Sequence, residues 1–408
     1  MTEFPIHRGT AADWPAIFEL LCAAFHDPVD PEESELERSV FEPDRSLVVF
    51  DGDRGEPVVA HAAAYTRELT GPGGVLPAAH VSLVGVAPTH RRRGLLTRLM
   101  HRQLAEVTEP LAVLWASEGR IYPRFGYGLA SRRISLSIDV REVRLPEPAT
   151  AGRLRTVPVD AARPDLERLY AAVRADRPGW SSRDGRWWSA LLADPASRRK
   201  DRTERRVTLH EGAGGIDGYA LWRTRSDWDA AGPSGEVIVQ EVVTNSPDAY
   251  LAVWRFLLGI DLTRTASLRL AGPDEPLLHL ADEPRRLSPR LGDGLYLRIV
   301  DLPAALTARR YAAPLDLVLE VTDRLLPGNA GRWRLTTGAD GAKGSCTRVS
   351  EPADLACDTA DLAAAYLGGA SLAALAAAGR VRELRPDALA PASVGFGWHQ
   401  APSAIEVF

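Results

Sequence analysis

The sequence predicts an α/β protein that folds as three units. The chain has 408 residues, which is enough for two or three domains with sizeable hydrophobic cores. Apolar residues make up 45% of the chain and charged residues 25%, as in ordinary globular proteins. Segments with helical apolar spacing alternate with short β-branched runs. These observations favour a mixed architecture of sheets and helices, with a mostly antiparallel start.

The first unit, residues 1–145, contains both kinds of segment. Apolar residues at helical spacing between Trp14 and Phe25 predict its first helix. A turn at Asp51-Gly52-Asp53 between two apolar runs predicts a hairpin. Helices are expected at residues 10–25 and 94–107, and strands at 47–50, 58–60, 81–86, 111–116 and 133–140.

The second unit, residues 146–295, follows a proline-rich linker and repeats this pattern. Its strand, helix and strand between residues 236 and 270 have the same order as in the first unit, but no phosphate-loop sequence follows 237–243. We therefore expect a degenerate copy of the first architecture, without cofactor chemistry. Helices are expected at 165–174, around Trp187 and Trp188, and at 247–259; strands are expected at 207–210, 217–223, 236–244 and 267–270.

The third unit, residues 296–408, is predicted to pack alanine-rich helices against a sheet. Small side chains allow helices to approach a sheet closely. Strands are expected at 315–321, 332–335 and 346–349, and helices at 361–367 and 371–378.

Composition excludes several classes of protein. The formal net charge of −5 argues against nucleic-acid binding. Apolar runs are too short to span a membrane, and the N-terminus lacks the features of a signal peptide, so we expect a cytoplasmic protein. Cys22, Cys346 and Cys357 lie far apart, which argues against a disulfide framework or a zinc cluster, and we expect no metal.

A basic turn at residues 91–94 separates the predicted strand 81–86 from the following helix. The first turn of a helix has unpaired N–H groups and the positive end of the helix dipole, which together attract phosphate. Gly94 allows close approach of the backbone, and the arginines supply charge and forked donors. This arrangement predicts a pyrophosphate site. The alternative is a solvated arginine turn at the start of a surface helix.

The same turn resembles the acetyl-CoA loop of the GNAT acetyltransferases, in which R/Q-x-x-G-x-G/A follows a strand. Arg91-x-x-Gly94 fits, whereas Leu96 stands where the superfamily usually has Gly or Ala. Longer motifs resemble the Eis (enhanced intracellular survival) family, and Leu96 is then a mark of that branch. These motifs are HRRRGLL at 90–96, ASEG at 116–119, YPRFGYG at 122–128, GLYLRIVDLPAAL at 294–306 and Thr10-x-x-Asp13-Trp14-Pro15.

This resemblance covers the whole chain and implies a GNAT domain, a second GNAT-like domain and a C-terminal domain like sterol carrier protein. It implies acetyl-CoA as co-substrate, a hexamer built as a trimer of dimers, and acetylation of amines, notably those of aminoglycosides. The residues it implies for acetyl-CoA are Val84 and Val86, which would pair with the pantetheine arm, and Arg91, Arg92, Arg93, Gly94 and Leu95, which would hold the pyrophosphate.

Acetyl transfer requires a group that handles the amine proton and a donor for the departing thiolate. The resemblance implies Tyr127 as general acid, with Tyr122 as the second candidate. Either tyrosine could instead be a buried ring whose hydroxyl bonds the backbone. The resemblance also implies that the terminal carboxylate of Phe408 is the base or orients the amine. Because a terminal carboxyl group ordinarily has a pKa of about 3.5, it would act through water or as a counter-charge. The alternative is a tail that only packs or frays.

The predicted acceptor site is acidic. Between residues 27 and 44 the chain carries eight acidic residues against Arg38 alone. This charge would attract a cationic acceptor, although a solvated helix face explains it equally well. Asp27 matches an acceptor-site acid of the family, and His26 is a weaker candidate. Family members often carry an acid at the penultimate position; here Val407 stands there, and Glu406 is the candidate substrate contact.

The sequence thus predicts an N-acetyltransferase for a small-molecule amine such as an aminoglycoside. Two alternatives stay open. In the first, the enzyme acetylates protein lysine, a polyamine or a small metabolite amine instead. In a different class, the chain would be a non-catalytic lipid-binding or regulatory protein that uses its C-terminal domain as a carrier.

Overall fold

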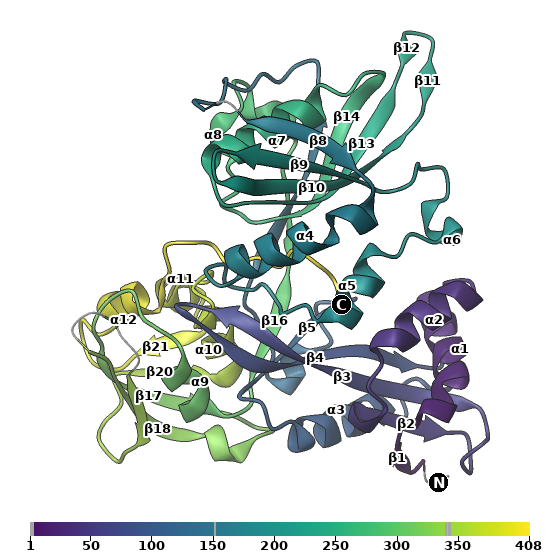
Figure 1. The fold of residues 1–408 in the computed structure, drawn as a ribbon. Helices are drawn as coiled ribbons and strands as arrows, with labels where there is room; N and C mark the ends of the chain where they lie inside the picture. Colours follow the sequence, from purple (N-terminus) through teal and green to yellow (C-terminus); the bar gives the residue numbers. More distant parts are fainter. Residues whose placement is uncertain (1–3, 151, 339–340, 342–343) are drawn as a thin grey trace.

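The computed structural model describes residues 4–150, 152–338, 341 and 344–408. Three mixed sheets, each covered by helices, form three units, and the prediction of an α/β fold is confirmed (Figure 1). Cys22, Cys346 and Cys357 are buried and unbridged. In the described part of the chain, every helix is too short or too polar to cross a membrane.

The first sheet has seven strands in the order β1-β2-β3-β4-β5-β16-β6. Side chains of β2 alternate between two cores: Val48 packs with α1 on one face, while Leu47 and Val49 pack with α3 on the other. The elements are β1 (Ile6–Arg8), α1 (Trp14–Phe25), α2 (Pro31–Val40), β2 (Ser46–Phe50), β3 (Val58–Gly71), β4 (Gly74–Val86), α3 (Leu95–Glu106), β5 (Leu111–Trp115), β6 (Gly128–Leu129) and β16 (Leu295–Ile299).

The second sheet has the order β15-β7-β14-β13-β10-β9-β8 and carries the helices of the second unit. Its strands are β7 (Arg132–Asp139), β8 (Arg153–Val157), β9 (Arg206–Gly212), β10 (Gly215–Arg225), β13 (Gly235–Thr244), β14 (Thr263–Ala271) and β15 (Arg290–Asp293), with a small ribbon of β11 (Trp228–Asp229) and β12 (Gly232–Pro233). Its helices are α4 (Val159–Arg174), α5 (Gly185–Leu192), α6 (Ala196–Arg199), α7 (Pro247–Leu258) and α8 (Leu277–Leu280).

Two strands join a sheet other than the one expected from their place in the sequence. The strand expected at 133–140 belongs to the first predicted unit, but β7 pairs with β14 and β15 of the second sheet, which corrects that expectation. β16, which lies at the predicted boundary between the second and third units, pairs antiparallel with β5 in the first sheet. Alternating hydrophobicity identifies a strand but not its partner, so these pairings could not be predicted from the pattern. As divisions of the sequence, 1–145, 146–295 and 296–408 stay predictions.

The third sheet has the order β19-β18-β17-β20-β21. The unit comprises α9 (Leu302–Ala308), β17 (Asp316–Thr322), β18 (Gly331–Thr336), β19 (Ser345–Arg348), β20 (Leu355–Asp358), α10 (Thr359–Tyr366), α11 (Leu372–Ala377), β21 (Val381–Glu383) and α12 (Leu389–Phe396). After α12 the chain runs back to the other two units, and its end lies between the first and second sheets near α5 (Figure 1).

Candidate active site

The first sheet opens between two neighbouring parallel strands. β4 pairs with β5 only from Ala78 to His80, opposite residues 111–113, and continues to Val86 without it. A bulge at Leu83, whose φ is +54°, interrupts the pairing of β4 with β3 just beyond this point. The Leu83 carbonyl accepts a 2.7 Å hydrogen bond from the buried His61 ring. Burial lowers the pKa of His61 to about 4, so the ring is neutral at pH 7.

Val84 and Val86 lie on the open edge of β4. The Ala87 N–H donates to the Val59 carbonyl of β3 at 2.8 Å. Because backbone groups alternate between the two edges of a strand, those of Val86 and Val84 face the side that β5 has left. Unpaired strand groups of this kind can pair with an extended ligand that carries amides.

The basic turn has the conformation that an anion site requires. Gly94 is the N-cap of α3 with φ of +79°, and a Cβ there would meet no atom within 4 Å. Among the described residues no side chain makes a capping hydrogen bond to this helix, which leaves its first N–H groups without that partner. Arg91, Arg92 and Arg93 are exposed, whereas Leu95 is buried and anchors the helix to the sheet. These residues suit a pyrophosphate.

Tyr127 lies on the α3 face of the sheet, at the opening. Its ring packs in a cluster that includes Val81 of β4, Leu114 of β5 and Met100 of α3. The hydroxyl is buried and has no hydrogen-bond partner among the described residues, which excludes the simple backbone-bonded alternative. Burial raises the pKa of Tyr127 well above its ordinary value, against the opposing charge of Arg298. The Tyr122 ring lies edge-on at 5.9 Å, and burial raises the pKa of Tyr122 to about 12.

The chain terminus lies on the opposite, α1 face. Ser82 Oγ donates to a terminal oxygen of Phe408 at 3.0 Å, and the Phe408 ring lies 4.6 Å from the His80 ring. Successive residues of a strand point to opposite faces, so Val81 contacts the Tyr127 cluster while Ser82 holds the terminus. Tyr127 and the terminal carboxylate therefore border the same opening from its two sides.

Glu406 is buried among arginines rather than open to a ligand. Its carboxylate pairs with Arg67, and with Arg183 Nε at 2.6 Å. Burial opposes ionisation, but the charges of Arg183 and Arg67 outweigh it and lower the pKa of Glu406 to about 2. The adjacent Val407 is exposed. A direct substrate contact by Glu406 stays a prediction, since both carboxylate oxygens already have partners.

Asp27 is exposed just beyond the end of α1. His26 ends that helix in the left-handed conformation, with φ of +62°. α1 crosses β4 closely, because a Cβ on Gly85 would lie 3.2 Å from Leu21. Asp27 thus lies on the face of the sheet that also holds the chain terminus. Its contact with an acceptor stays a prediction.

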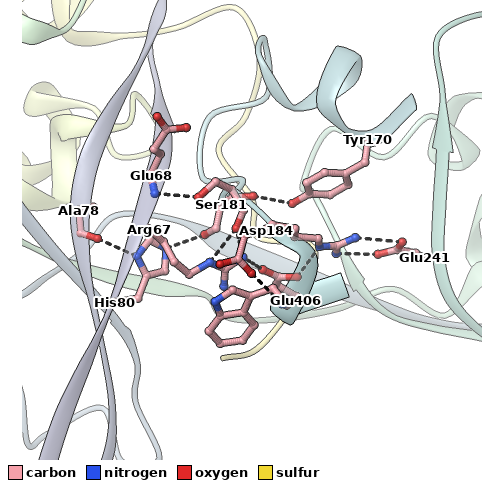
Figure 2. A network of polar contacts seen from close by, with 12 residues as sticks. Arg67, Glu68, Ala78, His80, Tyr170, Ser181, Asp184, Glu241 and Glu406 are labelled. Atoms are coloured by element: carbon pink, nitrogen blue, oxygen red, sulfur yellow. Dashed lines mark hydrogen bonds and ion pairs between the residues drawn. The ribbon is translucent and has the colours of Figure 1, made fainter. Parts of the chain in front are cut away.

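The sequence interpretation missed the residues that hold the tail. His80 Nε2 lies 2.7 Å from Ser181 Oγ (Figure 2). Trp115 Nε1 donates to the Glu406 carbonyl at 3.0 Å, and Arg67 donates to the Ser182 carbonyl. Burial lowers the pKa of His80 to about 3, so it is a neutral partner. The two partners of each of these contacts lie more than 100 positions apart in the chain, and no local motif links them. Among the described residues, no cluster of His, Cys, Asp or Glu could hold a metal ion.

Comparison with known proteins gives this architecture a class. Residues 5–130 match a family described as acetyltransferase (GNAT) domain, and residues 179–299 match a second family with the same description. Residues 302–404 match a sterol carrier protein domain. The fold and these matches define an acetyltransferase with two GNAT domains and a domain like sterol carrier protein. Enzymes of the GNAT superfamily use acetyl-CoA.

Whole-chain relatives identify the family. The chain is 39% identical over 389 residues to N-acetyltransferase Eis of Mycobacterium tuberculosis, covering 91% of this chain and 92% of that protein. It is 43% identical over 399 residues to an uncharacterized N-acetyltransferase of Streptomyces avermitilis, covering 96% of both. The crystal structure of Eis1 from Mycobacterium abscessus matches over both whole chains with a TM-score of 0.84 and 31% identity. The chain belongs to the Eis family of N-acetyltransferases, as the sequence motifs predict.

Proposed function

We propose that this enzyme acetylates amines of a cationic small molecule, such as an aminoglycoside, by direct transfer from acetyl-CoA. The observation that carries the proposal is the hydrogen bond from Ser82 to the terminal carboxylate, at the point where β4 and β5 separate. A carboxylate there can meet an amine that enters from the α1 face, opposite Tyr127.

Tyr127 is the proposed general acid. Because burial raises its pKa, the hydroxyl keeps its proton at neutral pH. Since no described residue accepts that proton, it is available to the thiolate that departs when the new N–C bond forms and the C–S bond breaks. Tyr127 then regains a proton from solvent or from the amine.

The Phe408 carboxylate is the proposed base or counter-charge. Because a terminal carboxyl group ordinarily has a pKa of about 3.5, such a group is too acidic to take a proton directly from an ammonium group. It would take the amine proton through a water molecule, or hold the ammonium in place until water does so. Asp27 and the other acids of residues 27–44 would draw the cationic acceptor to this face. A direct contact of Glu406 with the acceptor, as the sequence predicts, would require it to share a carboxylate that already pairs with Arg67 and Arg183.

The co-substrate residues are proposed as the sequence predicts them. Val84 and Val86 offer free backbone groups to the pantetheine arm, which carries amides. Arg91, Arg92, Arg93, Gly94 and Leu95 form the turn and helix start that suit the pyrophosphate. We also propose that the enzyme acts in the cytoplasm and forms a hexamer. Sedimentation of the purified protein would test the hexamer.

Two measurements test the function in sequence. Calorimetry with acetyl-CoA should show binding, and absence of binding would favour the non-catalytic lipid-binding or regulatory alternative. Thiol release should then be measured with an aminoglycoside, a polyamine, a lysine peptide and a small monoamine. We expect the aminoglycoside to have the highest kcat/KM. A higher value for one of the other amines would replace the acceptor and leave the acetyltransfer chemistry intact.

A further inference from the structure

Four charged side chains form a buried network between the first two units and the tail. Arg67 comes from β3, Arg183 precedes α5, Glu241 lies on β13, and Glu406 lies in the tail. Figure 2 shows Glu406 between Arg67 and the guanidinium group that bonds Glu241. Arg183 makes hydrogen bonds of 3.2 and 2.8 Å to Glu241 and one of 2.6 Å to Glu406.

The four formal charges balance, so the network is neutral only when the tail is docked. Removal of Glu406 would leave two buried cations against the single carboxylate of Glu241. Buried unpaired charge is strongly unfavourable, so removing one partner of a buried charge network is strongly destabilising. The Arg183 guanidinium also lies over the Tyr170 ring at 3.9 Å, which holds it in one orientation. Arg183 is therefore prepared to receive a carboxylate.

Neighbouring tail residues pack against different parts of the molecule. Ala404 belongs to a core shared by the first sheet and the third unit, and Ile405 to a core of the second unit with Tyr170 and Trp180. Ser403 N–H donates to the Pro178 carbonyl at 3.0 Å. Beyond Glu406, Val407 is exposed, and the Ser82 bond is made by the terminal group itself. Glu406 is thus the last charged anchor before the terminal carboxylate.

We propose that Arg183 and Arg67 are positioning residues that hold the terminal carboxylate in the active site by clamping Glu406. This inference rests on the proposed function for the role of the carboxylate, but not for the clamp. An arginine can serve Glu241 and Glu406 together because its guanidinium presents donors on several sides, whereas a lysine ammonium is a single point charge. The second GNAT domain contributes Arg183 and Glu241 to the active site of the first.

The test separates tail position from catalysis. Wild-type enzyme, Glu406→Gln, Arg183→Lys and Arg183→Met are incubated with carboxypeptidase A, which removes C-terminal aromatic residues, and loss of Phe408 is followed by mass spectrometry. In parallel, kcat, KM for acetyl-CoA and the pH profile are measured. Asp194→Asn is the matched control, because Asp194 pairs with Arg199 and Arg223 in the same unit, away from the tail contacts described above. Circular dichroism verifies folding.

We expect Glu406→Gln and Arg183→Met to lose Phe408 at least about 10-fold faster than wild type, with kcat lower by a similar factor and an unchanged KM for acetyl-CoA. Arg183→Lys should lie between them and wild type, and Asp194→Asn should match wild type. Fast release with normal kcat would support the clamp and overturn the catalytic role of the carboxylate. Release as slow as in wild type would overturn the clamp, whatever happens to kcat. If Arg183→Met fails to fold, Glu406→Gln, which keeps shape and removes only charge, decides the question.

Discussion

The two GNAT domains of this protein differ most where their equivalent helices begin. In the first domain, α3 starts at Gly94 without a side-chain cap and beside three arginines. In the second, Ser246 caps α7 by accepting from Ala249 N–H at 3.2 Å, and Asp248 adds negative charge to the first turn. The Asp248 carboxylate accepts hydrogen bonds from Ala149 N–H and Thr150. A pyrophosphate would meet an open positive site at α3 and an occupied, negative one at α7.

The two domains also differ in the opening between their parallel strands. β13 and β14 are parallel and pair from Gly235 to Val239, as β4 and β5 pair over a short stretch. A cavity of about 190 Å³ opens between β13 and β14, and the tail residues Ser403, Ala404 and Ile405 line it. In the first domain the corresponding opening holds Tyr127 and the chain end on its two faces. In the first copy the opening borders Tyr127 and the chain end, whereas in the second copy the cavity is lined by the chain's own tail.

The largest expected effect is a loss of unfolding free energy at low pH, which tests whether a charged Glu406 holds the tail. The pKa of Glu406 is lowered from 4.5 to about 2, since Arg183 and Arg67 outweigh burial. A carboxyl group with a depressed pKa stabilises the fold above its unfolded pKa, and this contribution is lost as the pH falls from 4.5 towards 2. The full contribution is about 3 kcal/mol. The difference in unfolding free energy between wild type and Glu406→Gln should therefore shrink between pH 6 and pH 3 in urea titrations. A difference that stays constant with pH would contradict a charged Glu406.

Tyr127→Phe tests the general-acid role proposed for Tyr127 in the first GNAT domain. Removal of the hydroxyl should lower kcat by about 100-fold, because the thiolate loses its acid, while acetyl-CoA affinity stays the same. Tyr122→Phe is the matched control, with a ring 5.9 Å away in the same cluster, and should keep kcat within about 3-fold. Since burial raises the pKa of Tyr127, the wild-type profile should show no loss of the acid below about pH 10. Equal losses in the two variants would remove the assignment.

Substitution of arginines in the basic turn at residues 91–94 is expected to have a smaller effect. Arg91→Ala combined with Arg93→Ala should raise KM for acetyl-CoA by about 10-fold, because two exposed cations each contribute a modest, salt-screened attraction. The ratio to wild type should fall at high ionic strength. Arg285→Ala with Arg286→Ala removes the same charge at a distant turn, η5 (Pro284–Leu287), and should leave KM unchanged. A similar rise in that control would mean that overall charge, not the turn, attracts the co-substrate.

The parts of the fold that the sequence predicts are those specified by residues close together in the chain. The helix at Trp14–Phe25 and the strand-turn-helix around Gly94 are specified by neighbours in sequence, so apolar spacing and a glycine at positive φ identify them. The long hairpin of β3 and β4 was underestimated, because Pro77 and several small residues interrupt the apolar pattern of β4. The pairing of β7 and β16 depends on partner choice, which sequence alone does not encode locally.

The clamp shows the same limit at the site. The sequence predicts Glu406 as a substrate contact because of its charge near the chain end. In the structure this charge pairs with Arg67 and Arg183. The segment Ser181-Ser182-Arg183-Asp184 carries no motif that indicates an active site. The partners of Arg183, which are Glu406 and Glu241, lie 223 and 58 residues away in the chain. Motifs identify residues that a ligand contacts through one segment. They miss residues whose role depends on three segments meeting.

Loss of the α7 cap is the mildest test of the comparison. Ser246→Ala removes the side chain that accepts from Ala249 N–H and that donates to Asp217 at 3.0 Å. The loss of an N-cap costs about 1 kcal/mol of unfolding free energy, and Ser246→Thr should restore most of it. Acetyl-CoA should still bind at a single site per chain by calorimetry, since Asp248 and the tail remain. A second binding event in Ser246→Ala would mean that the cap alone closes the second domain, and that its cofactor site is latent rather than lost.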